Sequence, residues 1–182
     1  MFAILPRIRR AVALASSALD GTARQAGVSF VPPCYWLAAK LDARSVIVDM
    51  GLGFDADFSQ AMIARFGLTS IGFDPTRKHY RQLEALADAS AGHFTVFPIA
   101  IGAQRGDITF HESKANVSGS ILSGHRNVRR DPVESYVVRV ITLADALAKT
   151  PAGRADLVKM DIEGAELDVL DAADDSTLTA CP

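Results

Sequence analysis

The chain has 182 residues, 49% of them hydrophobic and 22% charged, which is the usual balance of a globular protein and enough for one α/β domain with its own core. Its formal net charge of −2 gives no reason to expect a nucleic acid as partner, and no stretch is long and apolar enough to span a bilayer. The two cysteines, Cys34 and Cys181, are far apart and form no metal-binding pattern, which suits a reducing compartment such as the cytoplasm.

Residues 1–41 are predicted to form an N-terminal helical segment, followed by one α/β domain over residues 42–182. Three arginines and an alanine-rich run predict a surface helix over Met1–Leu19. A secretory signal peptide is the alternative, but the apolar run is short and contains two serines. Pro32–Pro33 stops any helix, and Cys34–Leu41 is expected to form one or two helical turns.

A strand followed by a glycine turn is predicted at the start of Val46–Ser59. The apolar run Val46–Val48 is typical of a buried parallel strand. Gly51, Gly53 and Ala56 then form a G-x-G-x-x-A turn. Glycines let the backbone come close to a ligand, and the helix that follows points free N–H groups into the turn. The pattern therefore predicts a ligand site, although an ordinary tight turn is the alternative.

The helix after this turn has an apolar face at helical spacing, formed by Phe58, Met62 and Phe66. Asp55 or Asp57 is expected to cap its start, and Gly67 to end it.

A second strand is predicted over Leu68–Phe73 and ends in Asp74. This acid lies about 20 residues beyond the turn, where an acid can bind a ribose hydroxyl. A helix capped by Thr76 is expected to run to about Ala89. His79, near its start, is interpreted as a surface histidine rather than a base.

Phe94–Phe97 is the third predicted strand. Ile108–His111 and Tyr136–Ile141 predict an antiparallel hairpin inserted beside the main sheet. The polar loop between them, Glu112–Ser135, is either a lid or binding loop or a mobile surface loop, and the sequence favours neither.

The last predicted strand, Leu157–Met160, ends in Asp161. It follows a short helix for which residues 142–145 match a capping box. Asp49, Asp74 and Asp161 therefore stand at the carboxyl ends of three parallel strands. Ligands of open α/β sheets bind at this edge.

Five segments resemble the FkbM-type S-adenosylmethionine-dependent methyltransferases: DMGLGFDADFS, GFDP, IAIG, ITLADAL and DLVKMDIEGAELDVL. The last is the most specific, and the resemblance covers roughly Ser45–Leu170. It implies an α/β fold of the Rossmann-like class I methyltransferase type, with a mainly parallel sheet. It also implies S-adenosyl-L-methionine as cofactor and O-methylation of a hydroxyl on a sugar or small metabolite, the acceptor being the expected partner.

The resemblance implies roles for individual residues. Its cofactor-binding positions are Asp49, Gly51, Gly53, Asp74, Ser118 and Ser120. Its catalytic positions, beside the transferring methyl, are Lys159, Asp161 and Glu163.

Methyl transfer to an alcohol needs a positioned acceptor and removal of the hydroxyl proton. Asp161 or Glu163 could accept that proton, and Lys159 could stabilise the developing oxyanion. Alternatively, Lys159 and Glu166 form only ion pairs at helix ends. The two carboxylates could also hold magnesium, but nothing else in the sequence completes such a site, and no metal is predicted.

A class I methyltransferase sheet has seven strands, whereas four main strands and the hairpin are predicted here. We therefore expect the C-terminal strands to be missing, as in a truncated product or fragment. The fourth strand would then have an exposed edge through which the chain could self-associate. Two other functions stay open: a non-catalytic cofactor-binding remnant or interaction module, and an NAD-dependent oxidoreductase.

Overall fold

The structure, a computed structural model, describes residues 28–31, 35–38 and 40–181 of a chain that divides into two units, Met1–Lys40 and Leu41–Pro182. The predicted N-terminal helix and Cys34 lie outside the described residues. In the first unit, β1 (Ser29–Val31) pairs antiparallel with β2 (Tyr35–Leu37). The helical turns expected there are therefore wrong for β2, whose aromatic and apolar residues favour a strand.

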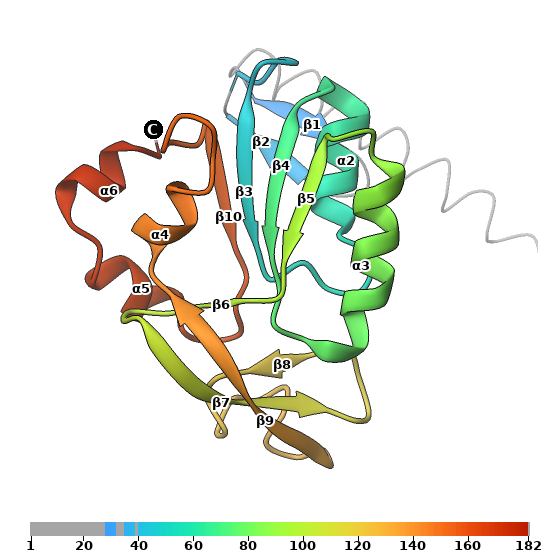
Figure 1. Cartoon of the computed structure of the whole chain (residues 1–182), viewed down its shortest axis with the longest axis vertical. Coiled ribbons are helices and arrows are strands. Elements are labelled where there is room, and N and C mark those ends of the chain that lie inside the picture. Colours follow the sequence, from blue (N-terminus) through green and yellow to red (C-terminus); the bar gives the residue numbers. More distant parts are fainter. Residues whose placement is uncertain (1–27, 32–34, 39, 182) are drawn as a thin grey trace, which may run out of the picture. The chain divides into compact units, whose positions relative to one another are not determined.

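Four parallel strands form the main sheet of the second unit, in the order β10-β3-β4-β5 (Figure 1). They are β3 (Val46–Met50), β4 (Thr69–Phe73), β5 (Phe94–Phe97) and β10 (Leu157–Met160). The four predicted strands are thus confirmed. Because all four run in one direction, their carboxyl ends meet at the same edge of the sheet.

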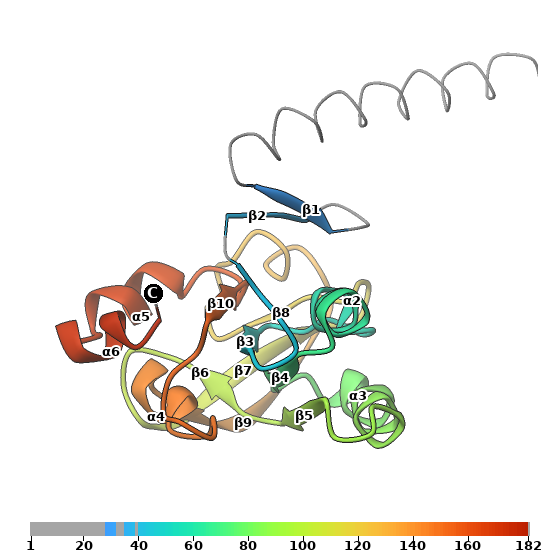
Figure 2. The ribbon, with the colours of Figure 1, turned by 90° about the horizontal axis from the view of Figure 1, so that it is seen from above.

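Helices cover both faces of the main sheet (Figure 2). On one face lie α2 (Asp57–Phe66) and α3 (Arg77–Ala89), and on the other α4 (Leu143–Leu147), α5 (Glu166–Asp171) and α6 (Asp175–Thr179). Among the described residues, no helix is both long and apolar enough to cross a membrane.

The apolar face predicted for α2 is buried where it meets the sheet. Phe58 is 4% exposed and Met62 is fully buried, while Phe66 is half-buried at the end of the helix. Burial of side chains of this size contributes about 1.5–3 kcal/mol each, which is enough to fix the helix on the sheet. Gly67 ends the helix, as predicted.

The starts of α2 and α3 are not capped by the side chains of the residues that precede them. Ala56, in a left-handed conformation, precedes α2 and makes no side-chain capping bond. Of the two acids expected at this start, Asp57 accepts the Phe58 amide at 2.8 Å, from within the first turn and not from the cap position. Thr76 precedes α3, but its side chain makes no capping bond either. The first amide of α3, that of Arg77, instead donates to Glu112, 35 residues away.

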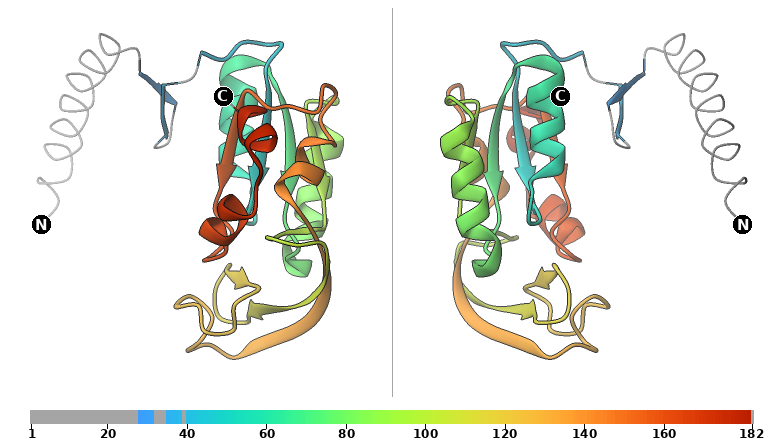
Figure 3. Two further views of the ribbon diagram at one scale, coloured as in Figure 1. Left: turned by 90° about the vertical axis from the view of Figure 1, so that its left-hand side faces the viewer. Right: turned by 90° about the vertical axis from the view of Figure 1, so that its right-hand side faces the viewer.

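A second, mixed sheet curls beyond the carboxyl ends of the main strands (Figures 1 and 3). Its order is β6-β9-β7-β8, with β6 (Ala100–Ile101), β7 (Gly106–Ser113), β8 (Gly119–Ser120) and β9 (Val133–Ile141). The pairing of β7 with β9 confirms the predicted hairpin, but places it in a separate sheet. Pro98 contributes to this separation, because it cannot donate a ladder hydrogen bond after β5.

The capping box predicted at the start of α4 is confirmed and is tied to the curled sheet. Asp145 accepts from the amide and hydroxyl of Thr142, and from two nitrogens of Arg105 at 2.7 and 2.6 Å. The hydrogen bonds from Arg105, together with those from Thr142, hold the pKa of Asp145 well below its ordinary value of 3.8.

Asp145→Asn is expected to lower the free energy of unfolding at pH 6 by about 1 kcal/mol, because a cap and an ion pair are weakened. A carboxyl whose pKa is lower in the folded state stabilises the fold above its unfolded pKa, and this contribution is lost as the pH falls. The difference between wild type and variant should therefore shrink below pH 3.8, when unfolding in urea is followed from pH 6 to pH 3. The matched control is Asp88→Asn, which removes an exposed carboxylate of α3. A difference that does not change with pH would contradict the assignment.

Candidate functional site

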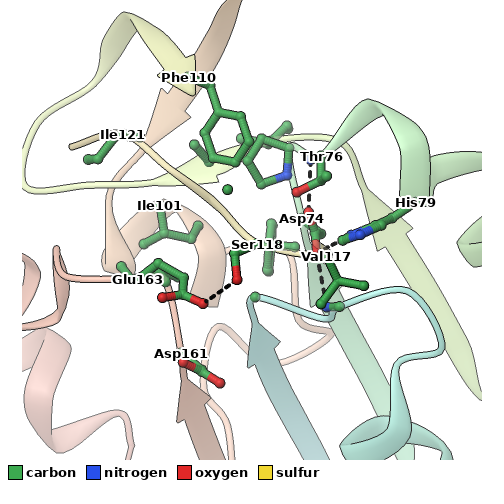
Figure 4. A pocket seen from close by; sticks show the side chains of 18 residues that line it. Asp74, Thr76, His79, Ile101, Phe110, Val117, Ser118, Ile121, Asp161 and Glu163 are labelled. Carbon is green, nitrogen blue, oxygen red and sulfur yellow. Dashed lines mark hydrogen bonds and ion pairs between the residues drawn. The ribbon is translucent and has the colours of Figure 1, made fainter. Parts of the chain in front are cut away.

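A cavity opens between the carboxyl ends of the main strands and the curled sheet (Figure 4). Most of its wall is apolar, with side chains from both sheets: Phe73, Ile99, Ile101, Phe110, Val117 and Ile121. Three acids also line it: Asp74, Asp161 and Glu163. An apolar cleft with a few charged groups is the usual form of a small-molecule site.

The structure brings together most of the residues predicted for the site. Those that line the cavity are Gly51, Gly53, Asp74, Ser118, Asp161 and Glu163. Asp49, Ser120 and Lys159 are not among the residues that line it.

The two glycines of the turn have different surroundings. The Gly51 amide donates to the Phe73 carbonyl at 2.9 Å, and a β-carbon on Gly51 would lie 1.8 Å from the Asp161 carbonyl oxygen. A β-carbon on Gly53 would meet no described atom within 4 Å. Gly51 therefore permits close packing of the strand ends, whereas Gly53 leaves open backbone beside the cavity.

Asp74 is 3% exposed and fixes the glycine turn from the end of β4. Its Oδ2 accepts the Gly53 amide at 3.1 Å, and its Oδ1 accepts the Thr76 amide at 2.8 Å. The predicted acid is thus at the cavity, but part of its hydrogen-bonding capacity holds the protein's own backbone.

His79 is buried, with 2% of its surface exposed, and it lines the cavity. The interpretation of His79 as a surface histidine is therefore wrong. Its Nδ1 lies 3.4 Å from Asp74 Oδ2 (Figure 4). Its ring makes a T-shaped contact with the ring of Phe54. The available signal was its position in the first turn of a helix that starts at the ligand edge of the sheet.

Asp49 and Lys159 form a pair beneath the glycine turn. Asp49 is fully buried, and its Oδ1 lies 3.3 Å from Lys159 Nζ, while Ser59 donates to its Oδ2 at 2.6 Å. Burial raises the pKa of Asp49, and Lys159 and Ser59 oppose that rise. Lys159 Nζ also donates to the Gly51 carbonyl, so this pair holds the turn from below.

The two acids after β10 differ in their surroundings. The Asp161 side chain is 71% exposed and forms a long ion pair with Lys159 Nζ at 4.0 Å. Glu163, with a left-handed φ of 61°, accepts from Ser118 at 3.3 Å and from Asn127 at 2.6 Å, and its Oε2 lies 3.2 Å from His125. Asp161 is available to a ligand, whereas Glu163 binds the loop of the curled sheet.

Ser120 also belongs to this attachment of the loop. Its hydroxyl donates to the Glu163 carbonyl at 2.8 Å and accepts the Leu122 amide at 3.0 Å. Sequence reasoning predicted a loop of this kind over Glu112–Ser135 without deciding its role. Its residues Val117, Ser118 and Ile121 form part of the cavity wall.

A second attachment joins the curled sheet to the start of α3. The Tyr136 hydroxyl donates to Glu112 at 2.5 Å, and both groups accept from the Arg77 amide. Burial and the bond to Glu112 raise the pKa of Tyr136, so its hydroxyl stays protonated at neutral pH. The curled sheet is therefore fixed on two sides of the cavity.

Within the part of the chain that the structure describes, no group of three or more His, Cys, Asp or Glu residues is arranged to hold a metal ion.

A comparison with protein-family sequence profiles matches the methyltransferase FkbM domain to residues 49–182. The match contains every residue considered above for the cavity. Searches of curated proteins and of solved structures gave no significant match.

The two glycines give a paired prediction. Gly51→Ala is expected to lower the free energy of unfolding by about 3 kcal/mol or more, because its β-carbon would overlap the Asp161 carbonyl. Gly53→Ala is expected to cost only about 1 kcal/mol, the strain of its left-handed backbone. Unfolding in guanidinium chloride measures both. Equal losses in the two variants would show that the packing at Gly51 is not as tight as described.

Proposed function

The chain belongs to the FkbM methyltransferase family, whose members use S-adenosyl-L-methionine, and we propose that it methylates a hydroxyl oxygen on a sugar or another small metabolite. The observation that carries this proposal is the cavity at the carboxyl ends of β3, β4 and β10. Three features line this cavity together: the backbone of Gly53, the acid Asp74 at the position where an acid can bind a ribose hydroxyl, and the exposed carboxylate of Asp161.

The residues present fit the cofactor. S-adenosylmethionine supplies an electrophilic methyl group on a positively charged sulfur. The acids Asp74, Asp161 and Glu163 give the cavity the negative charge that suits such a cation. Gly53 leaves room for close approach to the backbone, and apolar side chains such as Ile101 and Phe110 suit a flat base.

Of the two candidate bases, the contacts favour Asp161. Both carboxylate oxygens of Glu163 already face donors of the loop, namely Ser118, Asn127 and His125. Asp161 lines the same cavity, and its exposed carboxylate, which has a long ion pair with Lys159 Nζ at 4.0 Å, can accept the hydroxyl proton. In this proposal Glu163 holds the loop in place, and Asp161 accepts the proton.

The contacts of Lys159 favour a positioning role over the oxyanion role expected from sequence. Its Nζ is engaged with the Gly51 carbonyl and with Asp49, and it does not line the cavity. In this proposal Lys159 fixes the glycine turn and neutralises the buried Asp49.

Calorimetric titration of the whole chain with S-adenosylhomocysteine tests the cofactor, with NADH titrated in parallel. We expect S-adenosylhomocysteine to bind and NADH not to bind. A chain that is folded by circular dichroism and binds neither, or binds only NADH, would rule out the proposed function. A screen with methyl-labelled S-adenosylmethionine should then label hydroxyl acceptors, and labelling of amines alone would reject O-methylation.

With an acceptor found in that screen, Asp161→Asn is expected to lower kcat by about 10²–10⁴-fold, because it removes the proton acceptor. The affinity for S-adenosylhomocysteine should change little. The matched control is Asp168→Asn, which alters an exposed acid on α5 outside the cavity. If Asp161→Asn keeps wild-type kcat while Glu163→Gln loses it, the roles of the two acids are reversed.

A further inference from the structure

His79 carries a buried nitrogen without a partner at the edge of the cavity. The side chain is 2% exposed, and its Nε2 has no hydrogen-bond partner among the described residues. A buried polar atom left unpaired usually costs about 1–3 kcal/mol. Because His79 lines the cavity, a bound molecule can supply the missing partner.

The neighbouring Asp74 faces the Nδ1 atom of the His79 ring. Its Oδ2 lies 3.4 Å from His79 Nδ1, and an ionised carboxylate can only accept. An Nδ1–H can donate to this oxygen, and a ring that carries its one proton there presents Nε2 as an acceptor. The Phe54 ring, edge-on to His79 with centroids 6.0 Å apart, and the burial of the side chain hold the imidazole in this orientation.

The hydrogen bonds of Asp74 leave it little spare capacity. Each carboxylate oxygen has about two acceptor positions. Oδ2 accepts the Gly53 amide and faces His79 Nδ1, and Oδ1 accepts the Thr76 amide. One position on Oδ1 is left, so Asp74 can accept one further hydrogen bond.

The ribose of an S-adenosyl compound carries two hydroxyl groups, and an acid at the position of Asp74, after β4, is placed to bind a ribose hydroxyl. We propose that His79 is a cofactor-binding residue of this chain, whose Nε2 accepts a hydrogen bond from one ribose hydroxyl while Asp74 accepts the other. The inference rests on the proposed function, since it takes an S-adenosyl compound as the ligand of the cavity.

Two substitutions separate this role from packing. In His79→Asn the amide can replace Nδ1 as donor to Asp74 but cannot reach the position of Nε2. In His79→Gln the longer side chain restores an acceptor near that position. The matched control is His93→Asn, because His93 Nδ1 bonds the Leu68 carbonyl at the opposite end of the sheet. Thermal unfolding shows whether each variant is folded.

The affinity of each protein is measured calorimetrically for S-adenosylhomocysteine and for its 2′-deoxy and 3′-deoxy analogues. Wild type should lose affinity with both analogues. His79→Asn should bind S-adenosylhomocysteine about fivefold to tenfold more weakly, the contribution of one hydrogen bond, and should be insensitive to removal of one of the two hydroxyls. His79→Gln and His93→Asn should both stay sensitive to each hydroxyl.

Two results would overturn the inference, and they differ in what they say of the proposed function. If wild type binds S-adenosylhomocysteine but folded His79→Asn stays sensitive to both hydroxyls, His79 does not bind the ribose and the proposed function stands. If folded wild type does not bind S-adenosylhomocysteine, both the proposed function and the role of His79 fail.

Discussion

Three stretches of backbone meet at Gly51, and the cavity depends on how closely they approach one another. The Gly51 amide bonds the end of β4, and the Asp161 carbonyl at the end of β10 occupies the space of a β-carbon. Lys159 strengthens this junction, since it bonds the Gly51 carbonyl and pairs with the buried Asp49. A larger residue at position 51 would push the strand ends apart and, with them, the walls of the site.

Some of the acids near the cavity bond other groups of the protein, and others have carboxylate oxygens that a ligand can reach. Glu112 and Glu163 each bind donors that fasten the curled sheet, Glu112 at the start of α3 and Glu163 after β10. Asp49 is neutralised below the turn by Lys159. Among the acids of the described residues that line the cavity, Asp161 and part of the capacity of Asp74 are left for a ligand. This division is why neighbouring carboxylates in one motif, Asp161 and Glu163, have different proposed roles.

The curled sheet forms the second wall of the cavity, so the site is built from residues that lie far apart in the sequence. Its loop contributes apolar side chains such as Val117 and Ile121, and it is held by residues that are far away in the sequence. The start of α3 shows the same dependence, because its first amide is bonded by Glu112 and Tyr136 of the curled sheet and not by Thr76. The helix that carries His79 is thus positioned by the sheet that closes over the cavity.

The sequence by itself determined the four parallel strands, the helices α2 and α3, the glycine turn and the capping box at Thr142, because each depends on periodicity or on residues a few positions apart. It also placed Asp74 and Asp161 at one edge, since parallel strands end together. Only the tertiary structure decided that His79 is buried, that Lys159 bonds the Gly51 carbonyl and does not line the cavity, and that Glu163 holds a loop. The contacts of Glu163 and Lys159 join residues 36 and 108 positions apart, which no local pattern encodes, and the burial of His79 depends on how α3 packs at the cavity.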